Sequence, residues 1–193
     1  PGSSTLILKE GVTSNPSLGN RLSPGAVKYK DQDGDGVITT KDRTVIGNAL
    51  PKWYGGITNT FNYKGIDFSF MLQFNYGNDI YNATRLYATQ TNTQRRNQLA
   101  EVADRWSPTN ASNNGYVVND VYSRFVEDGS FLRLKNITLG YTLPHKWTRS
   151  FHVSKLRVYA TGQNLFCLNN YSGYDPEVST ASKSPMTPGL DWY

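Results

Sequence analysis

The sequence predicts an all-β chain that forms part of a transmembrane antiparallel β-barrel, with about four long strands joined by long loops. Apolar and polar residues alternate over as many as 11 positions, 17 glycines and 9 prolines interrupt the chain, and 13% of the residues are aromatic. A transmembrane strand needs about 9–11 residues, whereas a soluble strand usually has about 5–6. The length of the alternation therefore favours a membrane strand.

The first thirty residues are rich in turn residues, with a possible short strand over residues 5–8, and the strongest strand pattern follows in a hairpin over residues 55–76. Lys64-Gly65 separates its two arms, as in a tight two-residue turn. We expect the large apolar residues to face lipid: Ile57, Phe61, Ile66, Phe68, Phe70, Leu72 and Phe74, with Tyr63 and Tyr76 in aromatic girdles. The opposite face would line a wet lumen: Thr58, Thr60, Asp67, Ser69, Gln73 and Asn75.

A soluble sandwich with the same phenylalanines packed inward is the alternative, because alternation marks any half-buried sheet. The opposite face of the strand favours the membrane barrel over the sandwich. It carries small and amide side chains, with few of the lysines, arginines and glutamates that are common on soluble sheets.

Residues 77–127 form a long insertion, which we expect to be extracellular and to contain a short helix. Within the stretch "NTQRRNQLAEVADRW", the residues Leu99, Val102, Ala103 and Trp106 recur at helical spacing. The pattern stops before Ser107-Pro108. We expect this helix to pack on its own loop and to carry no chemistry.

Two more long strands follow the insertion. In "SFLRLKNITLGYTLP" the apolar parity shifts from Leu132 and Leu134 to Ile137 and Leu139, which predicts a β-bulge near Lys135-Asn136. The fourth strand is "KLRVYATGQNLF", with Leu156, Val158 and Ala160 on one face. We expect the chain from Cys167 onward to be a loop, and because barrels of this kind have short periplasmic turns and long extracellular loops, we expect it to be extracellular.

Composition excludes several classes of protein. The net charge is +5, but the basic residues are scattered, so no nucleic-acid footprint is present. The single Cys167 excludes an internal disulfide framework. No secretory leader pattern opens the chain, and no apolar run reaches the roughly 20 residues of a membrane helix.

The stretch "KYKDQDGDGVITTKD" carries the strongest site signal. Numbered from Asp31, its residues match the ligand spacing of an EF-hand-type calcium loop, with Gly36 at the turn position. The expected ligands are Asp31, Asp33, Asp35, Val37 through its carbonyl, Thr39 and Asp42. Calcium would then stiffen the loop in a structural role. Position 12 is Asp rather than Glu and flanking helices are not evident, so magnesium or an empty, solvated turn remain alternatives.

A catalytic constellation is not evident, and we do not expect an enzyme. His145 and His152 lie in one connection without a cysteine or acidic cluster beside them. Glu127 and Asp128 are neighbours just before a strand and face opposite sides, which makes them a poor acid–base pair.

Several stretches together resemble the C-terminal part of the SusC/RagA-type TonB-dependent outer-membrane transporters of Bacteroidota. They are "GAVKYKDQDGDGVITTKDRTVIGN", "PKWYGGITNTFNYKGIDFSFMLQFNYGNDIYN", "RFVEDGSFLRLKNITLGYTLP" and "LRVYATGQNLFCLNNYSGYDPEV", which cover most of residues 24–178. We therefore expect residues 1–193 to be part of a single barrel domain, without the plug.

The resemblance implies a multi-pass barrel in the outer membrane of a Gram-negative cell, which imports glycans or peptides. It implies a SusD-like surface lipoprotein as partner, the TonB complex acting through the plug, and the remainder of the same barrel around this segment. The acidic loop would lie at the extracellular rim. The rival hypotheses are a secreted calcium-clamped β-sandwich that binds carbohydrate and an adhesin-like structural domain.

Overall fold

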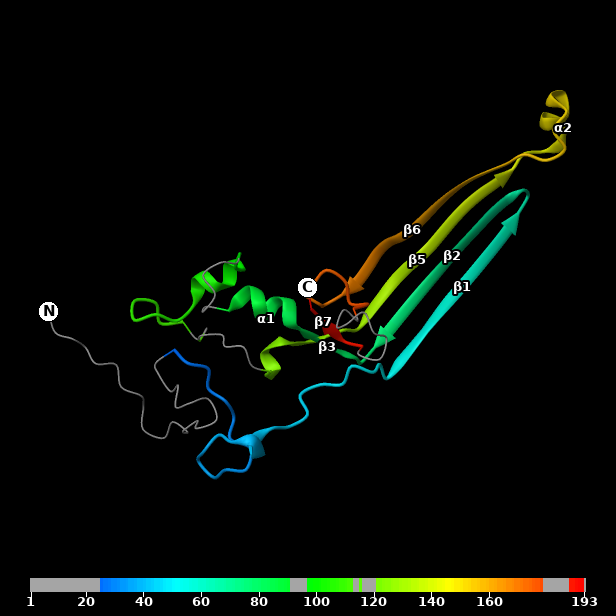
Figure 1. Ribbon diagram of the computed structural model, residues 1–193. Helices are drawn as coiled ribbons and strands as arrows, with labels where there is room; N and C mark the ends of the chain where they lie inside the picture. Colours follow the sequence, from blue (N-terminus) through cyan, green and yellow to red (C-terminus); the bar gives the residue numbers. More distant parts are fainter. Residues whose placement is uncertain (1–24, 91–96, 113–114, 116–120, 179–187, 193) are drawn as a thin grey trace. The chain divides into compact units, whose positions relative to one another are not determined.

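A computed structural model of the chain describes residues 25–90, 97–112, 115, 121–178 and 188–192 (Figure 1). The possible strand over residues 5–8 lies outside the described residues. The chain divides into two compact units, which we describe separately. The first contains the described residues up to Ile46 together with Asn82–Phe125, and the second contains Gly47–Tyr81 and Val126–Trp192.

The second unit is built on one antiparallel sheet with the strand order β1-β2-β5-β6. Its members are β1 (Trp53–Tyr63), β2 (Ile66–Tyr76), β5 (Phe131–Thr142) and β6 (Arg157–Asn169), each with 11 to 13 residues. All four long strands were predicted, and they run side by side (Figure 1). Their length is that of transmembrane rather than soluble strands.

The turn between β1 and β2 is the predicted two-residue hairpin. Lys64 and Gly65 have φ angles of 46° and 87°, and two successive positive φ angles define the type I′ turn that matches strand twist. A side chain at Gly65 would also place its Cβ 2.8 Å from the carbonyl oxygen of Thr142. Glycine is therefore required here by conformation and by space.

Register confirms the predicted faces of the sheet, because directly opposed residues share a face. One row crosses all four strands as Phe61, Phe68, Leu139 and Ala160, and another crosses them as Ile57, Leu72, Leu134 and Phe166. The opposite face carries the row Thr60, Ser69, Thr138 and Thr161. The sheet is thus mainly apolar on one face and mainly polar, with a row of hydroxyl groups, on the other.

Large apolar side chains remain exposed on the first face. Ile57 is 54% exposed, Phe61 56% and Leu139 54%. Aromatic residues bound this surface at both ends, with Trp53 opposite Tyr76 at one end, and Tyr63 and Tyr141 on either side of Ile66 at the other. An apolar band between two aromatic rows is the pattern of a lipid-facing barrel wall.

The predicted bulge is also confirmed. The β5 register shifts between Leu134 and Asn136, and Lys135 is left out of the pairing with both neighbouring strands. In β6 the pairing also omits Asn164, whose φ angle is 50°, and Leu165. These irregularities keep apolar residues on the lipid-facing side along the whole length of β5 and β6.

The prediction of a loop from Cys167 onward is wrong in part. β6 continues to Asn169, and Cys167 pairs with Arg133. The bulge at Asn164 interrupts the alternation and so hides the end of the strand in the sequence. Further along, β7 (Leu190–Asp191) adds a short strand.

A smaller sheet has the order β4-β3-β7, with β3 (Asp79–Asn82) between β4 (Val126–Asp128) and β7. Ile80 is completely buried and forms an apolar cluster with Tyr171 and Val178. The sequence interpretation placed these short strands in loops, because segments of two to four residues show no readable alternation.

The helical content of the insertion differs from the prediction. Ala100–Asp104 forms only a 3-10 turn, η3, and residues 92–96 of the expected helix lie outside the described part of the chain. An α-helix that was not foreseen, α1 (Ala83–Thr89), stands earlier, with the Asn82 side chain accepting the Arg85 N–H at 2.8 Å. η3 has no side-chain cap at its start, and Leu99 there is 44% exposed, so neither capping nor burial favours a longer helix.

An ion pair links α1 to η3 in the first unit. The Arg85 guanidinium donates two hydrogen bonds to the Glu101 carboxylate, at 3.0 and 2.8 Å. These bonds lower the pKa of Glu101, against the opposing effect of its burial. A third short segment of this unit, η4 (Ser123–Phe125), buries the Phe125 side chain.

The connection between β5 and β6 holds α2 (His145–Thr148) and the 3-10 turn η5 (Arg149–Phe151). It extends beyond the same ends of the strands as the Lys64-Gly65 turn (Figure 1). Within the described residues, no helix has the length and apolar character needed to cross a membrane.

Candidate functional site

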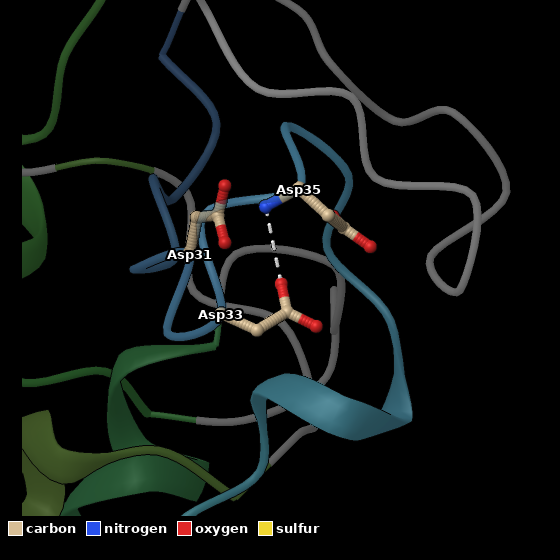
Figure 2. A group of neighbouring side chains, drawn as sticks. All are labelled: Asp31, Asp33 and Asp35. Carbon is tan, nitrogen blue, oxygen red and sulfur yellow. Dashed lines mark hydrogen bonds between the residues drawn. The ribbon is translucent and has the colours of Figure 1, made fainter.

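The acidic loop gathers three carboxylates as the sequence predicts. Oxygen atoms of Asp31, Asp33 and Asp35 lie within 4.8 Å of one another (Figure 2). Within the described part of the chain, this is the one group of three or more potential metal-ligating side chains that meets this criterion. Oxygen-rich clusters of this kind suit hard divalent cations such as calcium.

Backbone N–H groups hold these carboxylates in place. Asp31 accepts hydrogen bonds from Gly34 at 2.7 Å and from Gly36 at 2.9 Å, while Asp35 accepts one from Val37 at 2.8 Å. Gly34 and Gly36 have φ angles of 77° and 81°, which L side chains rarely adopt. The two glycines therefore let the chain fold back so that its N–H groups point at the aspartates.

The residues at the end of the loop form a capping box. Thr39 precedes the 3-10 turn η2 (Thr40–Asp42), its hydroxyl accepts the Lys41 N–H, and the Asp42 carboxylate accepts the Thr39 N–H at 2.6 Å. The other Asp42 oxygen accepts the Gln32 N–H at 2.8 Å. Asp42 thus fastens the end of the loop to its beginning, while the three other aspartates form the cluster.

The donor set fits a cation only in part. Asp31, Asp33 and Asp35 supply a compact oxygen cluster, whereas both Asp42 oxygens are hydrogen-bonded to backbone N–H groups. Ligation by Asp42, by the Val37 carbonyl and by Thr39 stays a prediction.

The pKa of Asp42 lies below its ordinary value of 3.8, because the N–H groups of Thr39 and Gln32 stabilise the carboxylate. A depressed pKa contributes stability above the ordinary value, and this stability disappears as the pH falls through the lower folded value. We therefore expect hydrogen–deuterium exchange in the loop, corrected for intrinsic rates, to be constant from about pH 7 to 5 and to rise below about pH 4. In Asp42→Asn this acid-dependent rise should be weaker; an identical rise would show that another group causes it.

A cavity of about 520 Å³ lies beside the loop in the same unit. Ile38, Thr39 and Asp42 line it together with Tyr29 and Tyr122. The two tyrosine rings meet edge to face, with centroids 6.0 Å apart. The loop is therefore bordered by an aromatic recess.

The polar face of the sheet carries a charge network that the sequence interpretation missed. The Arg133 side chain is only 8% exposed, and its guanidinium lies 2.5 Å from Asp175 and 3.1 Å from Glu177. Lys135 and Gln73 also reach Glu177, at 2.9 and 3.0 Å. The segment after β6 is thereby fastened to β2 and β5.

Burial and pairing act in opposite directions on Asp175. Burial would raise the pKa of its carboxyl, but the hydrogen bond from Arg133 and the N–H of Glu177 bring it below its ordinary value. The sequence offers one clue to this network, an arginine inside an apolar strand. It does not reveal the acidic partners, which follow 42 residues later.

A second ion pair lies on the same face near the hairpin turn. Arg157 in β6 donates hydrogen bonds of 2.9 and 2.5 Å to Asp67 in β2, across the intervening strand β5. The crossing is possible because Gly140 lies between them, where a Cβ atom would come within 2.5 Å of the carboxylate. Sequence analysis placed Asp67 on this face, and the structure agrees.

The remaining polar candidates have structural partners. Glu127 accepts hydrogen bonds from the N–H and hydroxyl of Ser172, both at 2.8 Å, and Asp128 accepts the Ser130 N–H. His145 begins α2, and His152 ends η5 with a φ angle of 55°. None of these geometries supplies an acid–base pair.

Known proteins of similar sequence are receptors. "TonB-dependent receptor P26" of Formosa agariphila is 38% identical over 167 residues, which cover 83% of this chain and 17% of that protein. "TonB-dependent receptor SusC" of Bacteroides thetaiotaomicron is 30% identical over 156 residues, which cover 79% of this chain and 15% of the relative. The chain thus spans less than one fifth of these curated relatives. No protein-family profile matches it.

Solved structures share the fold. The structure of the RagAB peptide transporter aligns with a TM-score of 0.67 and 22% identity, and the alignment covers 87% of this chain and 18% of that one. At this identity the comparison concerns the fold alone.

The two-faced sheet and these likenesses define the class: the chain is a portion of a transmembrane antiparallel β-barrel. It belongs to the SusC/RagA-like family of TonB-dependent outer-membrane receptors, whose barrel it represents in part. The relatives are receptors and transporters, which fits the expectation that the chain is not an enzyme.

Proposed function

We propose that this chain forms part of the wall of a TonB-dependent importer that carries oligosaccharides or peptides across the outer membrane. The observation that carries the proposal is the pairing of an apolar face bounded by aromatic rows with a hydroxyl-lined face on the same four strands. Lipid would cover the first face, and the second would face the transport path. The relatives support this assignment over a secreted, calcium-clamped β-sandwich.

The whole receptor would work with two partners. A SusD-like lipoprotein would close the extracellular mouth, and the TonB complex would act through the plug. The likeness to SusC and to the RagAB transporter supports both partners. This segment would contribute wall and rim, so the substrate would be selected jointly with the rest of the barrel, the plug and the lipoprotein.

A direct test uses the full-length receptor in its own outer membrane. An affinity-tagged receptor, purified in detergent, should retain a surface lipoprotein, and the intact mass of the complex should identify both chains. A strain lacking the receptor should lose uptake of either one class of oligosaccharides or one class of peptides. Unimpaired uptake of both classes, or a receptor that purifies as a soluble protein without detergent, would contradict the proposal.

We further propose that calcium occupies the cluster of Asp31, Asp33 and Asp35 and stiffens this loop at the extracellular rim. Three carboxylates held close together repel one another unless a cation neutralises them. Asp42 would assist by closing the loop through its backbone hydrogen bonds. The role is structural, and the lipoprotein partner would be the surface most affected by its loss.

Calcium removal should loosen the loop and leave the barrel folded. In the full-length receptor, chelation should increase hydrogen–deuterium exchange over residues 31–42 without changing the heat-modifiable migration of the folded barrel. Asp33→Asn removes one ligand charge, so the calcium concentration needed to protect residues 31–42 from exchange should rise roughly tenfold. Asp104→Asn, in the same unit but outside the cluster, should leave it unchanged. Unfolding of the strands on chelation would assign the metal a larger role.

A further inference from the structure

We propose that the strand ends at the Lys64-Gly65 turn and the β5–β6 connection form a binding site for an anionic phospholipid headgroup. The site consists of Lys64 at the turn and of Lys146, Trp147 and Arg149 in the connection, and we call it the basic rim. All four side chains are exposed, and Trp147 is 59% exposed. The proposed lipid site requires a membrane-spanning fold but not the proposed transport function, so either proposal can fail without the other.

The position of Lys64 gives the first support. Tyr63 is 68% exposed on the lipid-facing side, and the Lys64 ammonium lies 5.2 Å from the centre of its ring. The cation is thereby held on the lipid-facing side, directly beyond the aromatic row of Tyr63 and Tyr141. Tyrosines in such rows lie at the level of lipid headgroups.

Charge gives the second support. Residues 129–174 contain no aspartate or glutamate, so no acidic residue of the β5–β6 connection offsets Lys146, Arg149 and Lys155. The nearest acidic residue in the hairpin is Asp67, which lies on the opposite face and is paired with Arg157. The rim therefore presents uncompensated positive charge next to an apolar surface, which complements a lipid with a negative headgroup.

Exposed apolar side chains accompany these charges. Trp147, Val153 at 38% exposure and Leu156 at 44% all lie in the same connection. An exposed indole next to lysine and arginine is the composition of a membrane-interface anchor. Short turns lie on the periplasmic side of such barrels. The occupant is therefore a phospholipid of the periplasmic leaflet, such as phosphatidylglycerol.

The test is native mass spectrometry of the detergent-purified, full-length receptor with equal amounts of phosphatidylglycerol and phosphatidylethanolamine carrying the same acyl chains. We expect more phosphatidylglycerol adducts on the unmodified receptor. The combined variant Lys64→Gln, Lys146→Gln, Arg149→Gln should bind phosphatidylglycerol roughly tenfold or more weakly. Its binding of phosphatidylethanolamine should not change.

The matched control removes three exposed lysines from the other end of the strands and the acidic-loop segment: Lys28→Gln, Lys41→Gln, Lys52→Gln. This control should keep the preference for phosphatidylglycerol, although its net charge falls by the same amount as that of the combined variant. Equal adducts for both lipids, an unchanged combined variant, or the same loss in the control would overturn the proposal. Displacement by inorganic phosphate would also overturn it, because the rim would then bind any anion.

Folding of each variant is checked by heat-modifiable migration. If the combined variant does not fold, the single variant Lys146→Gln is tested instead, and it should bind phosphatidylglycerol about fivefold more weakly. No loss in that folded single variant would contradict the proposal. Retention of an acidic protein in place of lipid would assign the rim to a protein partner instead.

Discussion

Phe70→Arg is expected to destabilise the folded barrel by about 2–4 kcal/mol, the cost of a charged residue on the lipid face near the bilayer midplane. Phe70 lies in the middle of β2, opposite Asn59 and Ile137, and its ring packs against Phe61 and Phe68. The arginine would lose these contacts and enter hydrocarbon. Urea unfolding of the full-length receptor in lipid vesicles measures the change in the free energy of unfolding.

The next residue of the same strand provides the control. Met71 faces the other side, opposite Thr58 and Asn136, and it is 37% exposed. Met71→Arg should cost far less than Phe70→Arg, because the new guanidinium would enter a polar environment. Equal costs for the two variants would contradict the assignment of the faces.

Arg133→Met is the second large expected effect, with a loss of roughly 2 kcal/mol in the free energy of unfolding. Removing one partner of a fully buried ion pair costs about 3–5 kcal/mol. The cost here should be smaller, because the Asp175 and Glu177 side chains are 46% and 30% exposed. The methionine keeps the apolar volume of the side chain but leaves the two carboxylates without their main partner.

Hydrogen exchange should locate this effect in the segment fastened by Arg133. Residues 171–178 should exchange faster in Arg133→Met, while β1 should not change. Lys135→Met removes the other cation near Glu177, but the Lys135 side chain is 34% exposed, so the cost should stay below about 1 kcal/mol. Equal losses of unfolding free energy in the two variants would contradict the prediction that the burial of Arg133 makes its removal more costly than that of Lys135.

The long strands were predictable from sequence because their side chains alternate between two different environments. The hairpin turn, both faces of β1 and β2, and the bulge at Lys135 all followed from that alternation. The cluster of Asp31, Asp33 and Asp35 was predictable for a similar reason, since its spacing is local. Whether a cation binds there stays a prediction.

Other features depend on contacts between residues far apart in the chain, and periodicity does not record these. The network around Arg133 needs Asp175, which lies 42 residues away, and Asp67 meets Arg157 only because the register brings β6 within reach. The helical spacing around Leu99 misled for the opposite reason. The pattern is there, but η3 has no side-chain cap and Leu99 is largely exposed, so α-helix is not favoured.

The hydroxyl row of Thr60, Ser69, Thr138 and Thr161 has a consequence for any solute that moves along this face. Thr138 and Thr161 already share a hydrogen bond of 2.9 Å, and the charged groups on either side, Asp67 with Arg157 and Arg133 with Asp175, are satisfied by each other. Such a surface offers water-like hydrogen bonds but no unneutralised charge to retain a solute. Rapid passage requires that each contact be easily released. If this face lines the proposed transport path, it would hold a passing solute only weakly, and strong binding would have to come from other parts of the receptor.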